Sequence, residues 1–208
     1  MDNIETRILN SLQGPPKIFF AEDVRLKGVT MKTIRFALSG LANKGDIVRL
    51  AWGIYIKPAL NEHSLKRELP SPLEIAEAVA RRGNLILIPH GSQSARTLGL
   101  THDQGDTYIW FSNGATRQIG LAGGKSLKFI HSDDSRMFAF KNTTMRDVCN
   151  GLRYIGETQV GAYEKDAVRV ALKDVPWKDI QGDLRNCPEW VREIVLEACE
   201  GKEEKISE

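Results

Sequence analysis

The sequence predicts an α+β fold, because the spacing of its hydrophobic residues changes from helical to strand-like and back again along the 208 residues. Helical spacing near the N-terminus gives way to a short hairpin pattern at 47–57. Several short apolar runs separated by glycine-containing turns follow between residues 85 and 131, and helical spacing returns from residue 144. Small sheets and helices in separate stretches are the expected result.

Charge and proline content divide the chain into two domains. Residues 1–60 hold nine Lys and Arg against five Asp and Glu, a net charge of +4, whereas residues 61–208 carry a net charge of −2. The segment 58–72 combines three prolines with mixed charge, which is typical of a connection between domains. We therefore expect an N-terminal domain at 1–60, a linker at 61–72, and an α+β domain at 73–208 with a helical C-terminal part.

The first 28 residues predict two short helices. Residues 4–12 carry apolar side chains at helical spacing and end at the Gly-Pro-Pro segment 14–16, where proline cannot continue a helix. Residues 21–27 predict a second helix, which a following glycine ends. Between the two helices, Phe19 and Phe20 supply bulk for a small core.

A longer helix is predicted from residue 30 to residue 44. The Thr30 hydroxyl can accept a hydrogen bond from the free N–H groups of the first turn. Ile34, Leu38 and Leu41 recur on one apolar face, and Gly45 suits the left-handed conformation that ends a helix. The opposite face is polar and partly basic.

A strand at 47–50, a tight turn at 51–53 and a return strand at 54–57 follow this helix directly. A partly basic helix followed by a short hairpin is typical of the end of a winged helix-turn-helix. In that fold the helix enters the DNA major groove and the hairpin lies against the backbone or the minor groove. The alternative is a small helical domain of another function that shows the same pattern.

The candidate DNA contacts lie on the polar face of the helix and on the hairpin. Lys32 and Arg35 are one turn into the helix, where side chains reach base edges or flanking phosphates. Arg49 alternates outward and is expected to face phosphate. Trp52, at the tip, is expected to lie against sugar or in the minor groove, or else to pack on the hairpin. The other candidates are the polar side chains Thr33, Ser39, Asn43, Tyr55 and Lys57.

The larger domain begins with a capped helix. Ser71 at the N-cap, Pro72 at the first position and Glu74 at the third predict a capping box, and the helix is expected to end at 81–83. The elements expected after it are a strand at 85–88, a helix at 94–100, strands at 107–111, 117–121 and 126–131, hairpin turns at 112–114 and 122–124, an edge strand at 137–140, helices from 144, at 162–172 and at 188–198, a short turn at 183–185, and a frayed tail at 201–208.

Cysteines and histidines predict neither a metal site nor a disulfide framework. Cys149, Cys187 and Cys199 are widely spaced and odd in number, which indicates reduced, mostly buried thiols. No histidine has zinc-ligand spacing. We expect no cofactor. The chain has no run of roughly 20 apolar residues and no secretory leader, so we expect a cytoplasmic protein without membrane contact.

Catalytic motifs are incomplete. The segment 124–126 ends like a phosphate-binding loop, but the required earlier glycine is missing and a strand follows instead of a helix. His90, Ser92 and Ser94 do not form a nucleophile elbow. The predicted strands carry no acidic metal ligands, as a nuclease would require. We do not expect an enzyme.

Several segments resemble the AbiEi-like antitoxins of bacterial abortive-infection (type IV) toxin–antitoxin operons. The run at 41–58, LANKGDIVRLAWGIYIKP, resembles their wing. The runs at 70–84 (PSPLEIAEAVARRGN) and 90–121 (HGSQSARTLGLTHDQGDTYIWFSNGATRQIGL) look like their linker with its first helix and their central sheet, and the ends VCNGLRYIGE and CPEWVREIVLEA are similar to their helical C-terminus. The order of the segments also matches.

This resemblance implies a transcriptional autorepressor that binds repeats in its own promoter. It also implies opposition to a nucleotidyltransferase-type toxin, by direct contact or by function alone. One departure is Gly40, where relatives often have Arg in the helix; a glycine here costs about 1 kcal/mol against alanine. The alternatives are a winged-helix transcription factor whose second domain senses a ligand or partner, with no toxin, and a DNA-processing enzyme.

Overall fold

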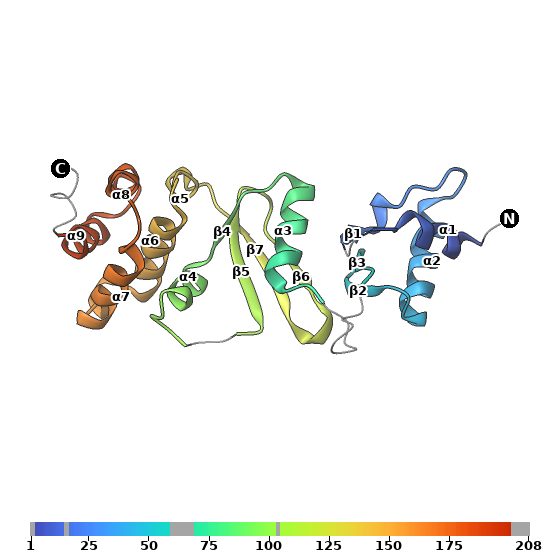
Figure 1. Cartoon of the computed structure of the whole chain (residues 1–208), viewed down its shortest axis with the longest axis horizontal. Helices are drawn as coiled ribbons and strands as arrows, with labels where there is room; N and C mark the ends of the chain where they lie inside the picture. The colour runs from blue at the N-terminus through green and yellow to red at the C-terminus, as the bar shows by residue number, and fades with distance from the viewer. Residues whose placement is uncertain (1–2, 15–16, 59–68, 103–104, 201–208) are drawn as a thin grey trace. The chain divides into compact units, whose positions relative to one another are not determined.

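The computed structural model describes residues 3–14, 17–58, 69–102 and 105–200 (Figure 1). The architecture is α+β with two small sheets, as predicted. Contacts divide the chain into one unit of residues 1–83 with 118–127 and another of residues 84–117 with 128–208. Most of the predicted linker, the proline stop at 15–16 and the predicted frayed tail lie outside the described residues.

The first unit begins with a three-stranded sheet beside two helices. Its elements are α1 (Ile4–Ser11), β1 (Ile18–Phe20), η1 (Ala21–Asp23), α2 (Met31–Lys44), β2 (Val48–Ala51) and β3 (Ile54–Ile56). The strands lie in the order β1-β3-β2, both pairs antiparallel, with Tyr55 opposite Phe19 on one side and Arg49 on the other. Ile8, Ile34 and Leu38 fill the core between the helices and the sheet.

The predicted second helix at 21–27 is wrong. Only the single 3-10 turn η1 forms, and Val24 after it is extended. The Asp23 carboxylate accepts from the Phe20 N–H at 2.9 Å and closes the turn. Ala21 and Val24 are buried, and Leu26 packs partly buried against the same core without helical structure. The strand β1 before it was not predicted, because three apolar residues show no alternation.

Helix α2 has the start, end and buried face that its sequence predicts. The Thr30 hydroxyl accepts from the Thr33 N–H at 3.3 Å, and Gly45 ends the helix at φ +81°. Ile34, Leu38 and Leu41 are buried. The face that carries the DNA candidates is therefore turned away from this core.

The first unit also contains α3 (Pro72–Gly83), most of β6 (Arg117–Gly120) and the turn η2 (Ala122–Gly124). The capping box is confirmed: the Ser71 N–H donates to Glu74 at 2.7 Å, and the Glu74 N–H donates to the Ser71 hydroxyl at 3.3 Å. The predicted hairpin turn at 122–124 is also present, with the Leu121 N–H donating to the Lys125 carbonyl at 2.8 Å.

The second sheet has the order β4-β5-β7-β6, formed by β4 (Leu87–Pro89), β5 (Thr107–Ser112), β7 (Ser126–His131) and β6. The predicted hairpin at 112–114 is wrong, because β7 lies between β5 and β6. Side chains of the connection bond to neighbouring segments instead: Asn113 accepts from the Ile86 N–H at 2.9 Å, and Thr116 accepts from the His131 N–H at 2.9 Å.

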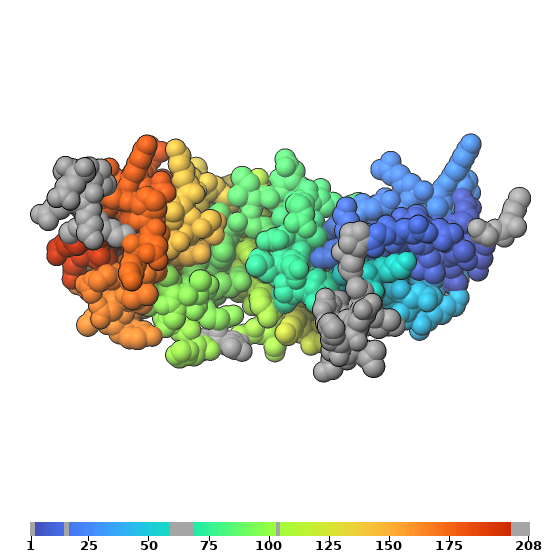
Figure 2. All heavy atoms as spheres, viewed as in Figure 1, coloured from blue at the N-terminus to red at the C-terminus, as the bar shows by residue number. Residues whose placement is uncertain are grey.

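Helices make up the rest of the second unit: α4 (Gly91–Thr97), α5 (Ser135–Phe138), α6 (Thr143–Ile155), η3 (Glu157–Gln159), α7 (Ala162–Leu172), α8 (Trp177–Leu184) and α9 (Glu189–Ala198). The stripe of α6 that includes Met145, Val148 and Leu152 is buried, as predicted, and so are all three cysteines. Helix α7, orange in Figure 2, lies at the surface, and its Tyr163 and Val170 are exposed.

Three predictions for this unit are corrected. The edge strand predicted at 137–140 does not form, and its first two residues end helix α5. The helix predicted at 94–100 spans Gly91–Thr97, and the turn predicted at 183–185 includes the end of α8. In α8 Ile180 and Asp183 are buried, and Trp177 and Leu184 pack partly buried against the same core. The buried Asp183 carboxylate accepts from the backbone N–H groups of Lys141 and Asn142 and joins α8 to the start of α6.

Candidate nucleic-acid interface

The exposed face of α2 combines basic and aromatic side chains. Lys32 and Arg35 are exposed, and Phe36, one turn after Lys32, is 82% exposed. Together with Thr33 and Ser39 they line one shallow surface pocket. An aromatic ring this exposed is unusual on the polar face of a helix, and such groups often mark a binding surface. Phe36 was not predicted as a site residue, although its place outside the apolar stripe was visible in the sequence.

The hairpin is fixed to this face through Arg49. Its Nη2 donates to the Ser39 hydroxyl at 2.7 Å, and that hydroxyl donates to the Arg35 carbonyl at 3.0 Å. The guanidinium also lies 5.8 Å from the ring centroid of Trp52 and 5.6 Å from that of Tyr55. Two predicted site residues on different elements, Ser39 and Arg49, are thus in direct contact.

Trp52 projects from the turn of the hairpin and is 89% exposed. Gly53 beside it has φ +75°, a conformation that glycine adopts without strain, and this permits the tight turn. The indole is therefore available to a partner, apart from the ring face near the Arg49 guanidinium.

Arg35 is held by an acidic neighbour. Its Nη2 lies 2.8 Å from Glu22 Oε1, and the side chains of both residues are accessible. The hydrogen bond from Arg35 is the largest cause that lowers the pKa of Glu22 below its ordinary value. Glu22 also faces Arg82 of α3, at 3.5 Å. The pairing of Glu22 with Arg35 and with Arg82 was not predicted, since 13 and 60 positions separate Glu22 from these residues in the sequence.

The other candidates occupy different environments. The Thr33 hydroxyl bonds to that of Thr30 at 2.9 Å within the helix cap. Asn43 is exposed near the end of α2, and Lys57, after β3, is half-buried. The prediction that Tyr55 contacts phosphate does not fit its position: Tyr55 is 3% exposed and stacks on Phe19 at 5.8 Å. β3 is the central strand of its sheet, and all three of its residues are buried.

The glycine at position 40 lies against α1. A Cβ atom there would approach Glu5 Oε1 to 2.7 Å, and Glu5 forms an ion pair with Lys44. A longer side chain at this position would meet a carboxylate of α1.

The second unit contains a separate pocket of about 300 Å3. His90 lies in it between the rings of Phe111, at 5.2 Å, and Tyr154, at 5.9 Å, and Arg153 also lines it. Burial, followed by the charge of Lys128, lowers the pKa of His90 below its ordinary value.

The three polar residues considered for nucleophilic chemistry do not form a catalytic triad. His90 Nδ1 bonds to the Ser92 hydroxyl at 2.9 Å within the cap of α4, whereas the Ser94 hydroxyl donates to Asp147 at 3.2 Å. Within the described residues, no three His, Cys, Asp or Glu side chains are grouped so that they could hold a metal ion.

Comparison with known proteins gives one match. Residues 3–180 match the model of a protein family described as a family of unknown function, DUF6088. The searches of curated proteins and of solved structures each found no match. Among the described residues no helix is long and apolar enough to cross a membrane. The family match covers most of the chain, and the protein therefore belongs to the DUF6088 family.

Proposed function

We propose that this protein is a DNA-binding transcriptional regulator and that its N-terminal part acts as a winged helix. The observation that carries the proposal is the joining of two exposed features, the α2 face with Lys32, Arg35 and Phe36 and the hairpin with Trp52, through the bond from Arg49 to Ser39. The strand order β1-β3-β2, with α2 directly before the hairpin, suits this reading.

The charge of this region supports a duplex as the partner. Residues 1–60 carry a net charge of +4, and each phosphate that a Lys or Arg neutralises releases counterions. Lys32 lies in the first turn of α2 and Arg35 in the second, the part of a recognition helix that reaches base edges in the major groove. In this reading Arg49 orients the hairpin, and Trp52 contacts the sugar or the minor groove.

The resemblance to AbiEi-like antitoxins extends the proposal to an autorepressor of its own operon that opposes a nucleotidyltransferase-type toxin. The support for this extension is that the resembling segments occur in the same order in this chain as in the AbiEi-like antitoxins. The alternative, a regulator whose second unit senses a small ligand, is favoured by the pocket around His90, since its aromatic rings and Arg153 could hold an anionic or aromatic compound.

Binding of the full chain to the duplex upstream of its own gene tests the DNA-binding proposal. We expect tighter binding to this duplex than to a scrambled duplex of equal length, with an affinity that falls steeply as salt is raised. Arg35→Ala should reduce the preference by about 1–3 kcal/mol, whereas Lys178→Ala, which removes an exposed charge on α8, should not. Equal affinity for both duplexes would contradict the proposal.

The antitoxin proposal is tested separately. We expect co-expression with the neighbouring gene to restore growth that this gene alone inhibits. A neighbouring gene that is harmless by itself would remove this part of the proposal and leave DNA binding unaffected.

A further inference from the structure

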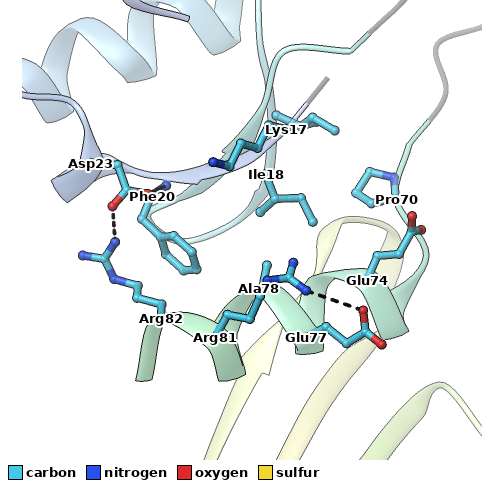
Figure 3. A pocket seen from close by; sticks show the side chains of 11 residues that line it. Lys17, Ile18, Phe20, Asp23, Pro70, Glu74, Glu77, Ala78, Arg81 and Arg82 are labelled. Carbon is cyan, nitrogen blue, oxygen red and sulfur yellow. Dashed lines mark hydrogen bonds and ion pairs between the residues drawn. The ribbon is translucent and has the colours of Figure 1, made fainter. Parts of the chain in front are cut away.

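Glu22 is shared by two arginines from different helices. Its Oε1 lies 2.8 Å from Arg35 Nη2 in α2, and its Oε2 lies 3.5 Å from Arg82 Nη2 in α3. Arg82 also pairs with Asp23, and its guanidinium lies 4.5 Å from the centroid of the Phe20 ring (Figure 3). The result is a row of alternating charges that starts at a proposed DNA contact and ends in α3.

The two ends of this row differ in their freedom. The side chain of Arg35 is 58% exposed and has one carboxylate partner, whereas that of Arg82 is 37% exposed and has two, besides an aromatic ring. Asp23 is itself fixed, because it accepts from the Phe20 N–H. Moving Arg35 away from Glu22 therefore requires less free energy than moving Arg82 away from its partners.

Stability alone does not explain the arrangement. Exposed ion pairs contribute about 0–1 kcal/mol to folding. A carboxylate on the DNA side of the protein, however, opposes binding when it is unpaired, because it repels phosphate. When Arg35 turns to DNA, Glu22 keeps a positive partner only if Arg82 stays beside it.

We propose that Glu22 is a positioning residue for Arg35, and that Arg82 retains Glu22 when Arg35 moves to DNA. This inference rests on the proposed DNA-binding function and describes how DNA binding at the same site is regulated. Because Arg82 belongs to α3, a change in the position of α3 would alter DNA affinity through Glu22. The sequence gives no sign of this link, since it joins residues far apart in the chain.

The test compares promoter binding by the full-length wild type, Glu22→Gln, Arg82→Gln and the double variant. Arg82→Gln should weaken binding by about threefold to tenfold, the range for coupled charges in contact, and should have little effect once Glu22 is Gln. Glu22→Gln alone should lower the preference for the promoter over a scrambled duplex. The matched control is Arg81→Gln, which removes the same charge from α3 but from a side chain that pairs with Glu77.

A second measurement does not involve DNA. The Glu22 carboxyl carbon, followed by NMR, should titrate at a higher pKa in Arg35→Ala and in Arg82→Gln than in the wild type, because each variant removes a positive partner. Thermal unfolding of each variant establishes that it is folded. If Arg82→Gln does not fold, the Glu22→Gln arm decides: an unchanged promoter preference overturns the inference.

The outcomes separate this inference from the function on which it rests. A wild-type protein that does not prefer its promoter refutes the proposed function, whatever the NMR titration shows. A wild type that prefers its promoter, with equal losses in Arg81→Gln and Arg82→Gln or with an Arg82 effect that persists without Glu22, refutes the inference alone.

Discussion

Arg49 in β2 and Ser39 in α2 are joined by a hydrogen bond of 2.7 Å from Nη2 to Oγ. Each was predicted from the sequence as a separate DNA contact, yet the two side chains are hydrogen-bonded to each other. The Ser39 hydroxyl donates in turn to the Arg35 carbonyl, so that the hairpin is connected to the backbone of α2 one turn earlier. This bond sets the direction of the hairpin relative to the helix face.

Ser39→Ala should therefore disturb the hairpin as well as the helix surface. Arg49 Nε is already buried without a hydrogen-bond partner, and the variant would remove the partner of Nη2 too. We expect the free energy of unfolding to fall by about 1–3 kcal/mol and promoter affinity to fall with it. Urea denaturation of Ser39→Ala, Arg49→Ala and the double variant measures the coupling. Strictly additive losses would show that the bond contributes nothing.

Trp52→Ala should separate binding from stability. Because the indole is almost fully exposed, its removal should change the free energy of unfolding by no more than about 0.5 kcal/mol. Promoter affinity should fall about tenfold if the ring lies against DNA. Trp110→Ala is the opposite control: Trp110 is buried, and its loss should cost about 3–5 kcal/mol of stability. Unchanged affinity of Trp52→Ala would exclude a role for the hairpin tip.

Local signals allowed much of the fold to be predicted. Thr30, Gly45 and a regular apolar stripe define α2, the capping box defines the start of α3, and α7 spans the predicted residues 162–172. The elements that were missed depend on distant contacts. Strand β1 is only three residues long, and the order of the second sheet places β7 between β5 and β6. Neither feature leaves a periodic pattern in the sequence.

The candidate site was predictable as a set of positions but not as a network. The exposure of the Lys32 and Arg35 side chains follows from helical periodicity, and that of Trp52 follows from its place in a tight turn. The pairing of Arg35 with Glu22 and the burial of Tyr55 do not, because they depend on how the turn η1 and the central strand β3 pack against the helix.

His90 should make stability depend on pH. Its pKa is lowered in the folded protein, mainly by burial, so the folded state disfavours the charged imidazolium. The unfolded chain then binds the proton more tightly, and stability falls as pH drops below the ordinary histidine pKa of about 6.5. In His90→Gln the part of this loss of stability that is due to His90 should be absent. Urea denaturation between about pH 5 and pH 8 gives the two curves, and identical curves would contradict the prediction.

Asp183 offers a test of the C-terminal helices alone. Its buried carboxylate accepts from the Lys141 N–H at 3.0 and 3.1 Å and from the Asn142 N–H at 2.8 Å. Asn142 is the N-cap of α6, so α8 orders the start of the neighbouring helix. Asp183→Ala would remove the carboxylate that accepts from both N–H groups and should cost about 3 kcal/mol of unfolding free energy.

Asp183→Asn keeps the shape of the side chain but loses its charge and one acceptor, so its cost should lie between those of the wild type and Asp183→Ala. Glu193→Ala, which removes an exposed carboxylate from α9, should change stability by no more than about 0.5 kcal/mol. Chemical denaturation measures all three variants. Amide hydrogen exchange at Lys141 and Asn142 should quicken only in the Asp183 variants, and slow exchange in Asp183→Ala would mean that another group had replaced the carboxylate.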